Sequence, residues 1–213
     1  MKPQPPLDAA NLEKLVERAK GLIAQGERCL LGICGAPGAG KSTLAESLVA
    51  ALDGQAVLVP MDGFHLADAE LDRLGRRERK GAPDTFDAAG YVNLLRRLRT
   101  REDETVYAPV FVREQEQALA GALPVPRHVP LVVTEGNYLL LADGPFRPVR
   151  ELLSEAWFLD VDPDLRRGRL LKRHLRHGRS VQQAEQWVAT TDEPNARLID
   201  ATKDRADLLV RLS

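Results

Sequence analysis

The segment GAPGAGKST, residues 35–43, is rich in glycine and ends in a lysine followed by two hydroxyl side chains. Glycines let the backbone turn so that several N–H groups point at one place, which is the geometry that binds phosphate oxygens. A lysine in this position adds positive charge, and a serine hydroxyl is a ligand for Mg²⁺. The segment therefore predicts a P-loop for ATP with Mg²⁺, formed by Gly35, Ala36, Gly38, Ala39, Gly40, Lys41, Ser42 and Thr43.

Two acidic residues follow apolar runs and are candidates for the chemistry itself. Asp62 follows the run AVLVP, and Glu135 closes the run PLVVTE. Ligands bind at the carboxyl ends of parallel strands, so both acids are expected in the crevice of the P-loop, with the strand before Asp62 beside the P-loop strand. Asp62 is placed to accept the proton of an attacking hydroxyl group. Glu135 is expected to hold the metal with Ser42, directly or through water, or to assist the acceptor hydroxyl, while Lys41 stabilises the transferred phosphoryl group.

A strongly basic helix is predicted near residues 164–179. From Arg166 to Arg179 the chain has seven Lys or Arg residues and no acid. Arg166, Arg169 and Arg173 fall on one helical face, and guanidinium groups suit phosphate oxygens. The helix is interpreted as a lid in which Arg166 binds the nucleotide and the other two arginines neutralise charge in the transition state. A solvated basic face and a nucleic-acid patch are the alternatives.

Short apolar runs alternate with helical patterns along the chain. Because the runs are continuously apolar, both faces of a parallel sheet must be covered by helices. We expect a single α/β domain with the three-layer P-loop NTPase fold, an N-terminal helix in residues 1–27, an acceptor-binding insertion at 61–128 and the lid at 164–179. The residues from Gly121 to Pro130 carry three prolines and predict a loop. The five core parallel strands are expected at residues 29–34, 56–60, 130–136, 157–162 and 207–212.

Length and composition narrow the classes of function. A length of 213 residues fits one domain, and a net charge of −1 disfavours a protein that coats nucleic acid. No stretch approaches the ~18 apolar residues of a membrane span, and no signal pattern opens the chain. We therefore expect a cytoplasmic protein with neither a membrane nor a nucleic-acid partner. Cys29 and Cys34 share one predicted strand but point to opposite faces, so both are expected to be reduced core residues.

The motifs taken in order resemble a known group of kinases. GAPGAGKS, DGFHL, RKGAPDTFD, EGNYLLL and the basic helix resemble the uridine kinase, pantothenate kinase and phosphoribulokinase group, from about residue 29 onward. Within it the chain looks most like bacterial proteins described as putative fructose transport system kinases. The resemblance implies transfer of the γ-phosphoryl group of ATP to a hydroxyl of a small molecule, with Asp62 as the base. It places these further residues near the acceptor: Arg79, Lys80, Asp87, Tyr107, Arg113, Asn137 and Tyr138.

Other assignments stay open at this point. His65 is a candidate for substrate contact or for loop packing, and Asn195 for substrate or phosphate contact or for a helix cap. The acceptor is open between a sugar, a nucleoside and a pantothenate-like compound. Two alternative classes of function remain. One is a regulatory P-loop protein, and the other is a nucleotide kinase, in which the phosphate of the acceptor would meet Arg76, Arg77, Arg79 and Lys80. A homodimer formed through the N-terminal helix is also open.

Overall fold

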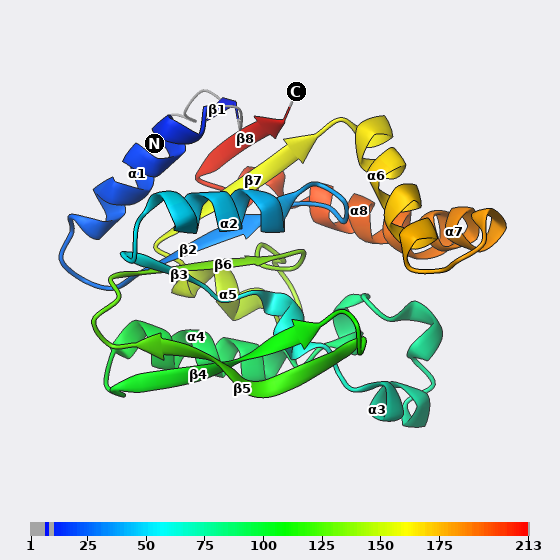
Figure 1. Cartoon of the computed structure of the whole chain (residues 1–213), viewed down its shortest axis with the longest axis horizontal. Helices are drawn as coiled ribbons and strands as arrows, with labels where there is room; N and C mark the ends of the chain where they lie inside the picture. The colour runs from blue at the N-terminus through cyan, green and yellow to red at the C-terminus, as the bar shows by residue number, and fades with distance from the viewer. Residues whose placement is uncertain (1–6, 9–10, 213) are drawn as a thin grey trace.

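A parallel β-sheet forms the centre of the computed structural model, which describes residues 7–8 and 11–212; residues 1–6, 9–10 and 213, including the start of the predicted N-terminal segment, lie outside the described residues. The strand order is β1-β8-β7-β2-β6-β3, and every pairing is parallel (Figure 1). The five predicted strands are confirmed, and the two-residue β1 extends one edge. The strands are β1 (Leu7–Asp8), β2 (Cys29–Cys34), β3 (Ala56–Leu58), β6 (Leu131–Gly136), β7 (Glu155–Val161) and β8 (Leu208–Leu212).

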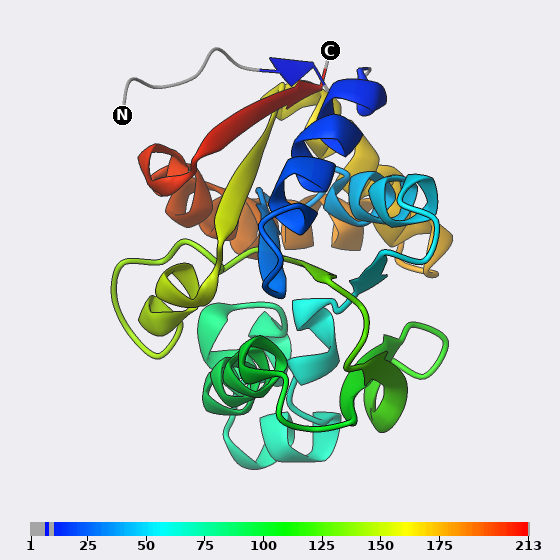
Figure 2. The same cartoon turned by 90° about the vertical axis from the view of Figure 1, so that its left-hand side faces the viewer.

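Helices cover both faces of this sheet, so the predicted three-layer fold is confirmed. Figure 2 shows α1 and α2 on one side of the strands and α5 and α8 on the other. Within β2, Leu31 and Ile33 belong to the core under α1 and α2, whereas Leu30 and Cys34 face the opposite core. Cys29 lies on the other face from Cys34, and both thiols are buried and free. The covering helices are α1 (Leu12–Ile23), α2 (Lys41–Ala51), α4 (Ala88–Thr100), α5 (Arg147–Leu152) and α8 (Glu193–Asp200).

The segment between β3 and β6 forms the lower part of the molecule in Figure 1. It ends in an antiparallel pair, β4 (Thr105–Val112) and β5 (Gln117–Pro126). The predicted loop from Gly121 is therefore wrong as far as Pro126. Among the described strands β5 pairs only with β4, and an edge strand tolerates proline because one of its sides needs no N–H donors. Before β4 come the short elements η1 (Met61–Phe64), α3 (Asp68–Arg73), η2 (Arg77–Arg79) and η3 (Pro83–Thr85), then α4.

The C-terminal third supplies the predicted lid helix, α6 (Pro163–Arg176). After it come α7 (Val181–Trp187), a π turn (Val188–Asp192) and α8. Pro194 lies in the first turn of α8, directly after the π turn. A π turn adds one residue to a helical turn, and such turns are frequent at functional sites.

The buried side chain of Arg28 connects the insertion to the sheet by hydrogen bonds. Arg28 immediately precedes β2 and is 5% exposed. Its guanidinium donates to the carbonyl oxygens of Leu98 (3.2 Å), Val129 (3.0 Å), Pro126 (2.5 Å) and Arg127 (2.9 Å). One side chain therefore satisfies carbonyl groups from the end of α4 and from the chain that leaves β5.

We expect the Arg28→Ala variant to lose about 2–4 kcal/mol of unfolding free energy, because buried carbonyl groups would be left without donors. Urea denaturation measures this loss. The matched control is Arg96→Ala, since Arg96 is exposed and bonds only to Asn93 on its own helix. Equal stabilities of the two variants would contradict a structural role for Arg28.

Candidate active site

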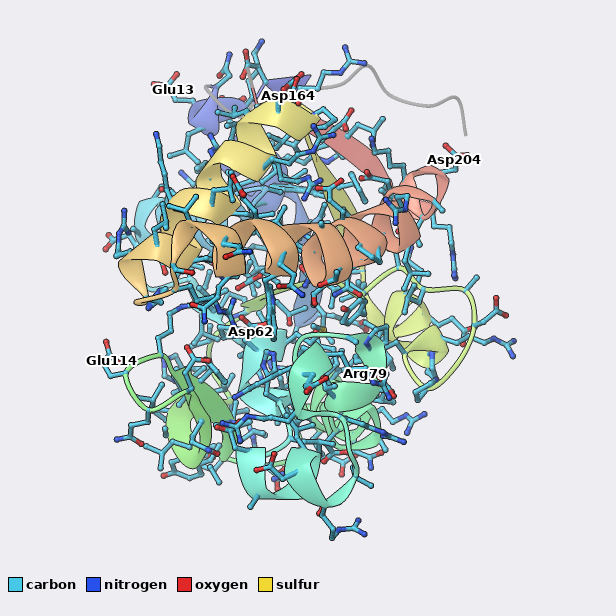
Figure 3. The ribbon with its side chains drawn as sticks, turned by 90° about the vertical axis from the view of Figure 1, so that its right-hand side faces the viewer. Glu13, Asp62, Arg79, Glu114, Asp164 and Asp204 are labelled. Carbon is cyan, nitrogen blue, oxygen red and sulfur yellow. The ribbon has the colours of Figure 1, made fainter. Side chains whose placement is uncertain are left out.

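A cleft of about 550 Å³ lies between the P-loop, the segment α6–α8 and the insertion. In Figure 3 Asp62 lies at the centre of the molecule, below the α7–α8 segment, while Arg79 lies to one side of it. Fourteen of the predicted site residues line this cleft: Gly38, Gly40, Lys41, Ser42, Thr43, Asp62, His65, Lys80, Arg113, Glu135, Asn137, Arg169, Arg173 and Asn195. Gly35, Ala36 and Ala39 complete the loop that carries the first five.

The P-loop follows the central strand β2 and opens α2, as the sequence predicts. Gly38 and Gly40 have φ angles of 80° and 95°, a region that favours glycine. A Cβ atom on Gly38 would also lie 2.8 Å from Leu170 Cγ of the lid helix. The loop therefore needs glycine both for its turn and for the close approach of α6.

Lys41 is buried at the start of α2 and points along the loop. Its Nζ donates to the carbonyl of Ala36 at 3.2 Å and to Asn137 Oδ1 at 2.7 Å. Burial lowers the pKa of Lys41, and the nearby Glu135 carboxylate opposes this shift. Asn137, predicted beside the acceptor, thus positions the P-loop lysine and also lines the cleft.

Ser42 and Glu135 form the candidate metal site. Ser42 Oγ donates to Glu135 Oε1 at 2.9 Å. Burial and then the charge of Asp62 raise the pKa of Glu135 to about 7. A hydroxyl and a carboxyl group at the end of a phosphate-binding loop are the oxygen ligands that Mg²⁺ prefers, so these residues fit a nucleotide with a divalent metal.

The raised pKa of Glu135 has a consequence for stability in the absence of ligands. In the folded protein the group binds a proton up to about pH 7, whereas its ordinary value is 4.5, so the folded state carries the extra proton between these values. Stability should therefore fall as pH rises through this window. We expect Glu135→Gln to lack this fall, which urea denaturation at stepped pH measures. Glu46→Gln, an exposed substitution on α2, should keep the wild-type profile, and a wild-type profile in Glu135→Gln would contradict the assignment.

Asp62 faces the P-loop from the insertion. It lies in η1 after β3, and β3 pairs with β6, not with β2. The expectation that its strand neighbours the P-loop strand is therefore wrong, because β6 lies between them. A Cβ on Gly63 would lie 2.4 Å from the carbonyl oxygen of Pro109, so η1 packs tightly on β4. Across the cleft wall, Arg113 Nη2 lies 3.7 Å from Asp62 Oδ2.

Two predicted acceptor residues, His65 and Lys80, are held by neighbours that the sequence did not single out. The His65 ring packs between Phe86 and Phe111, at centroid distances of 4.0 and 4.8 Å. Lys80 Nζ lies 2.6 Å from Asp68 Oδ1. Asp68, Phe86 and Phe111 all line the cleft, and nothing in their sequence spacing marks them.

Four predicted acceptor residues lie outside the cleft. Arg79 is exposed and pairs with Asp84 at 2.5 Å. Asp87 caps α4 by accepting from the N–H of Gly90 at 2.8 Å. Tyr107 is 59% exposed on β4, and Tyr138 is fully buried, with its hydroxyl donating to the carbonyl of Gly81. The structure therefore does not bring these four residues into the cleft with the other predicted acceptor residues.

The three lid arginines share one face of α6 but take different positions. Arg166 is 4% exposed; it donates to the carbonyl of Pro37 at 3.3 Å and pairs with Glu193. It therefore supports the P-loop from behind and does not face the cleft, contrary to its predicted contact with nucleotide. Arg169 donates to the carbonyl of Ala39 at 3.2 Å and lines the cleft. Arg173 also lines it, and burial lowers its pKa.

A polar cluster beside these arginines was missed. His174 Nε2 lies 2.8 Å from Asp192 Oδ2, and Arg179 Nη1 lies 2.6 Å from His174 Nδ1. The Arg179 guanidinium stands 3.9 Å from the centroid of Trp187. Trp157 is in the core, whereas Trp187 lines the cleft.

These features define a P-loop nucleotide-binding protein in which the Asp62 carboxylate lines the same cleft as the phosphate-binding loop. A comparison with protein families gives the finer class: the model of the "Phosphoribulokinase / Uridine kinase family" matches residues 30–212. The chain belongs to this family.

Individual relatives agree with this membership. "Putative uridine kinase C227.14" of Schizosaccharomyces pombe is 33% identical over 194 residues, 87% of this chain and 82% of that protein. "Uncharacterized protein YggC" of Escherichia coli is 33% identical over 191 residues, 87% of this chain and 78% of its own length. The solved structure of a "putative fructose transport system kinase" from Silicibacter sp. TM1040 has a TM-score of 0.86 and 37% identity, covering 93% of this chain and 98% of its own.

The protein is thus a small-molecule kinase of this family, which confirms the predicted fold, enzyme class and resemblance. Family membership implies a nucleotide and a divalent metal as well. Within the described residues, no helix is long and apolar enough to span a bilayer.

Proposed function

We propose that this kinase transfers the γ-phosphoryl group of ATP to a hydroxyl group of a small molecule, with Asp62 as the base. One observation carries the proposal: Asp62 from the insertion and the P-loop residues Lys41 and Ser42 line the same cleft. Phosphoryl transfer requires mainly positioning and charge neutralisation, so one such carboxylate on the acceptor side is sufficient.

On the donor side, the P-loop N–H groups and Lys41 would bind the phosphates of ATP. Ser42 and Glu135 would hold Mg²⁺, which when bound neutralises charge on the phosphate oxygens. Glu135 has a raised pKa in the ligand-free protein and would release its proton to act as a ligand. Asn137 keeps Lys41 aligned with the loop.

On the acceptor side, Asp62 orients the hydroxyl group and accepts its proton as the new P–O bond forms. Arg113 Nη2 lies 3.7 Å from Asp62 Oδ2 and helps to position this carboxylate. Arg169 and Arg173, from the lid helix at 164–179, supply positive charge to the transferred group. In this proposal the insertion at 61–128 carries the acceptor site.

The charges of the insertion argue against a phosphorylated acceptor such as a nucleotide. All four cations that a second phosphate was predicted to meet already have acidic partners within the insertion. Arg76 and Arg79 pair with Asp84 at 3.4 and 2.5 Å, and Arg77 and Lys80 pair with Asp68 at 2.9 and 2.6 Å.

The test is coupled ADP release by the purified protein with ATP and Mg²⁺ across sugars, polyols, nucleosides, nucleotides and pantothenate-like compounds. We expect one class of unphosphorylated alcohol to raise ADP release well above the rate without acceptor, with one ADP formed per phosphorylated product. Turnover that no alcohol stimulates would overturn the proposal, and stimulation by nucleoside monophosphates alone would replace it with a nucleotide kinase.

A further inference from the structure

The hydrogen bonds of His65 define which ring nitrogen carries a proton. The carbonyl oxygen of Asp62 accepts from the backbone N–H of His65 at 3.1 Å and lies 2.8 Å from its Nδ1. A carbonyl oxygen can only accept hydrogen bonds, so Nδ1 must be the donor. Burial lowers the pKa of His65, which favours the neutral ring. In the neutral Nδ1–H tautomer, Nε2 carries a lone pair and is an acceptor.

Nε2 of His65 has no hydrogen-bond partner among the described residues. In the described part of the chain no side-chain nitrogen or oxygen is both fully buried and without a partner, so Nε2 must be accessible. The residue lines the cleft, on the same short turn as Asp62. Nε2 of His65 is thus a hydrogen-bond acceptor at the cleft without a donor. A bound molecule with a hydroxyl group would supply that donor.

The aromatic rings of the cleft offer little free surface for a base. Phe86 and Phe111 pack against the two sides of His65, and Lys80 Nζ lies 5.4 Å from the Phe111 centroid. Arg179 covers a face of Trp187. Stacking on aromatic rings is a usual means of binding a flat base, and here each of the three rings is already in contact with His65 or a cation.

The other groups around Asp62 are polar and suit hydroxyl groups. Arg113 is a hydrogen-bond donor, the carboxylates of Glu116 and Asp68 are hydrogen-bond acceptors, and the amide of Asn195 is both. All four residues line the cleft. Asn195 Nδ2 also donates to the carbonyl oxygen of Gly81 at 3.5 Å, which holds the Asn195 side chain next to the insertion. A small molecule with many hydroxyl groups would form more hydrogen bonds with these four side chains than an aromatic ring would.

We propose that the acceptor is a non-aromatic polyhydroxylated molecule, a sugar, a polyol or a related acid, and that His65 selects it by accepting a hydrogen bond at Nε2 from a hydroxyl group other than the one phosphorylated. This inference rests on the proposed function and goes beyond it by naming the acceptor class and a specificity-determining residue. The relatives named as uridine kinases are expected to differ from this chain in that wall.

The first arm of the test compares acceptor classes by ADP release with ATP and Mg²⁺. We expect a non-aromatic polyhydroxylated compound to stimulate turnover and uridine, cytidine and adenosine to give none. The second arm removes the hydroxyl groups of that acceptor one at a time. For one deoxy analogue we expect kcat/KM to fall roughly 30–100-fold in the wild type, because Nε2 then lacks a donor, but less than about threefold in His65→Phe.

Further variants separate recognition from folding. His65→Phe keeps a ring between Phe86 and Phe111 but has no acceptor, and it should lower kcat/KM for the full acceptor without changing KM for ATP. His65→Gln, with an amide oxygen, should restore part of the loss. His128→Phe, an exposed histidine outside the cleft, is the matched control and should match the wild type.

Three results would overturn the inference. A nucleoside as the best acceptor would leave the proposed function standing and reject the acceptor class. Equal losses on every deoxy analogue in the wild type and His65→Phe would reject the role of His65. If no alcohol of either class is phosphorylated, the proposed function fails and this inference fails with it.

Discussion

Replacing Asp62 with asparagine is expected to lower kcat for phosphoryl transfer by roughly 10²–10⁴-fold, the usual contribution of a general base. Asparagine keeps the size and hydrogen-bonding reach of the side chain but cannot accept the proton of the acceptor hydroxyl. Binding of ATP should be unchanged, because in the proposed mechanism the contacts to phosphate come from the P-loop and not from Asp62. Acceptor-dependent ADP release measures the first quantity, and nucleotide titration measures the second.

The stability of the same variant provides an internal check. The charge of Asp62 opposes ionisation of Glu135, so removing it should leave the free energy of unfolding the same or higher. The matched control is Asp103→Asn, an exposed aspartate that pairs with Arg97 on the insertion and should retain full activity. A stable Asp62→Asn protein with wild-type kcat would remove Asp62 from the mechanism.

The second large effect is expected for Lys41→Met, which should lower kcat/KM for ATP by about 10²–10³-fold through loss of charge at the transferred phosphate. The ammonium group is buried and its pKa is lowered by that burial, so it is held in an unfavourable environment. The lowered pKa means that the surroundings of Lys41 as a whole, Glu135 included, disfavour its charged form in the folded protein, so removing the charge should not reduce stability. We therefore expect activity to fall while unfolding free energy does not.

Lys20→Met, an exposed change on α1, is the control for Lys41→Met and should affect neither quantity. One competing result is informative: if Lys41→Met both inactivates and destabilises the protein, the bond from Lys41 to Asn137 is mainly structural. In that case Asn137→Ala should reproduce the loss of stability, as urea denaturation would show.

Much of the fold follows from local sequence pattern. The five continuous apolar runs correspond to the strands β2, β3, β6, β7 and β8, and the glycine-rich segment leads into α2 at Lys41. Strand order is not local, however. Nothing in the runs before Asp62 and Glu135 shows that β6 lies between β2 and β3, because neighbour order depends on contacts between distant segments.

The site was predictable where a motif fixes the geometry and less so where packing does. Arg166 lies on the predicted face of α6, but Glu193, which pairs with it, is 27 residues further along the chain. Trp187 has the residue type of a core position, and only the fold of α7 on α6 brings it to the cleft beside Arg179. Asp87 resembles a substrate contact in sequence, yet its carboxylate caps α4.

The two tryptophans lie in different environments, so intrinsic fluorescence can report on the cleft and on the core separately. Trp157 of β7 is fully buried in the core between the sheet and the helices α1 and α2, and Trp187 lies in the cleft against a guanidinium group. The chain has no other tryptophan. A change in intrinsic fluorescence on adding nucleotide would therefore originate at Trp187, whereas the change on denaturation would be dominated by Trp157. In the Trp157→Phe variant, the remaining fluorescence of Trp187 would report binding in the cleft. In the Trp187→Phe variant, the fluorescence of Trp157 would report unfolding of the core.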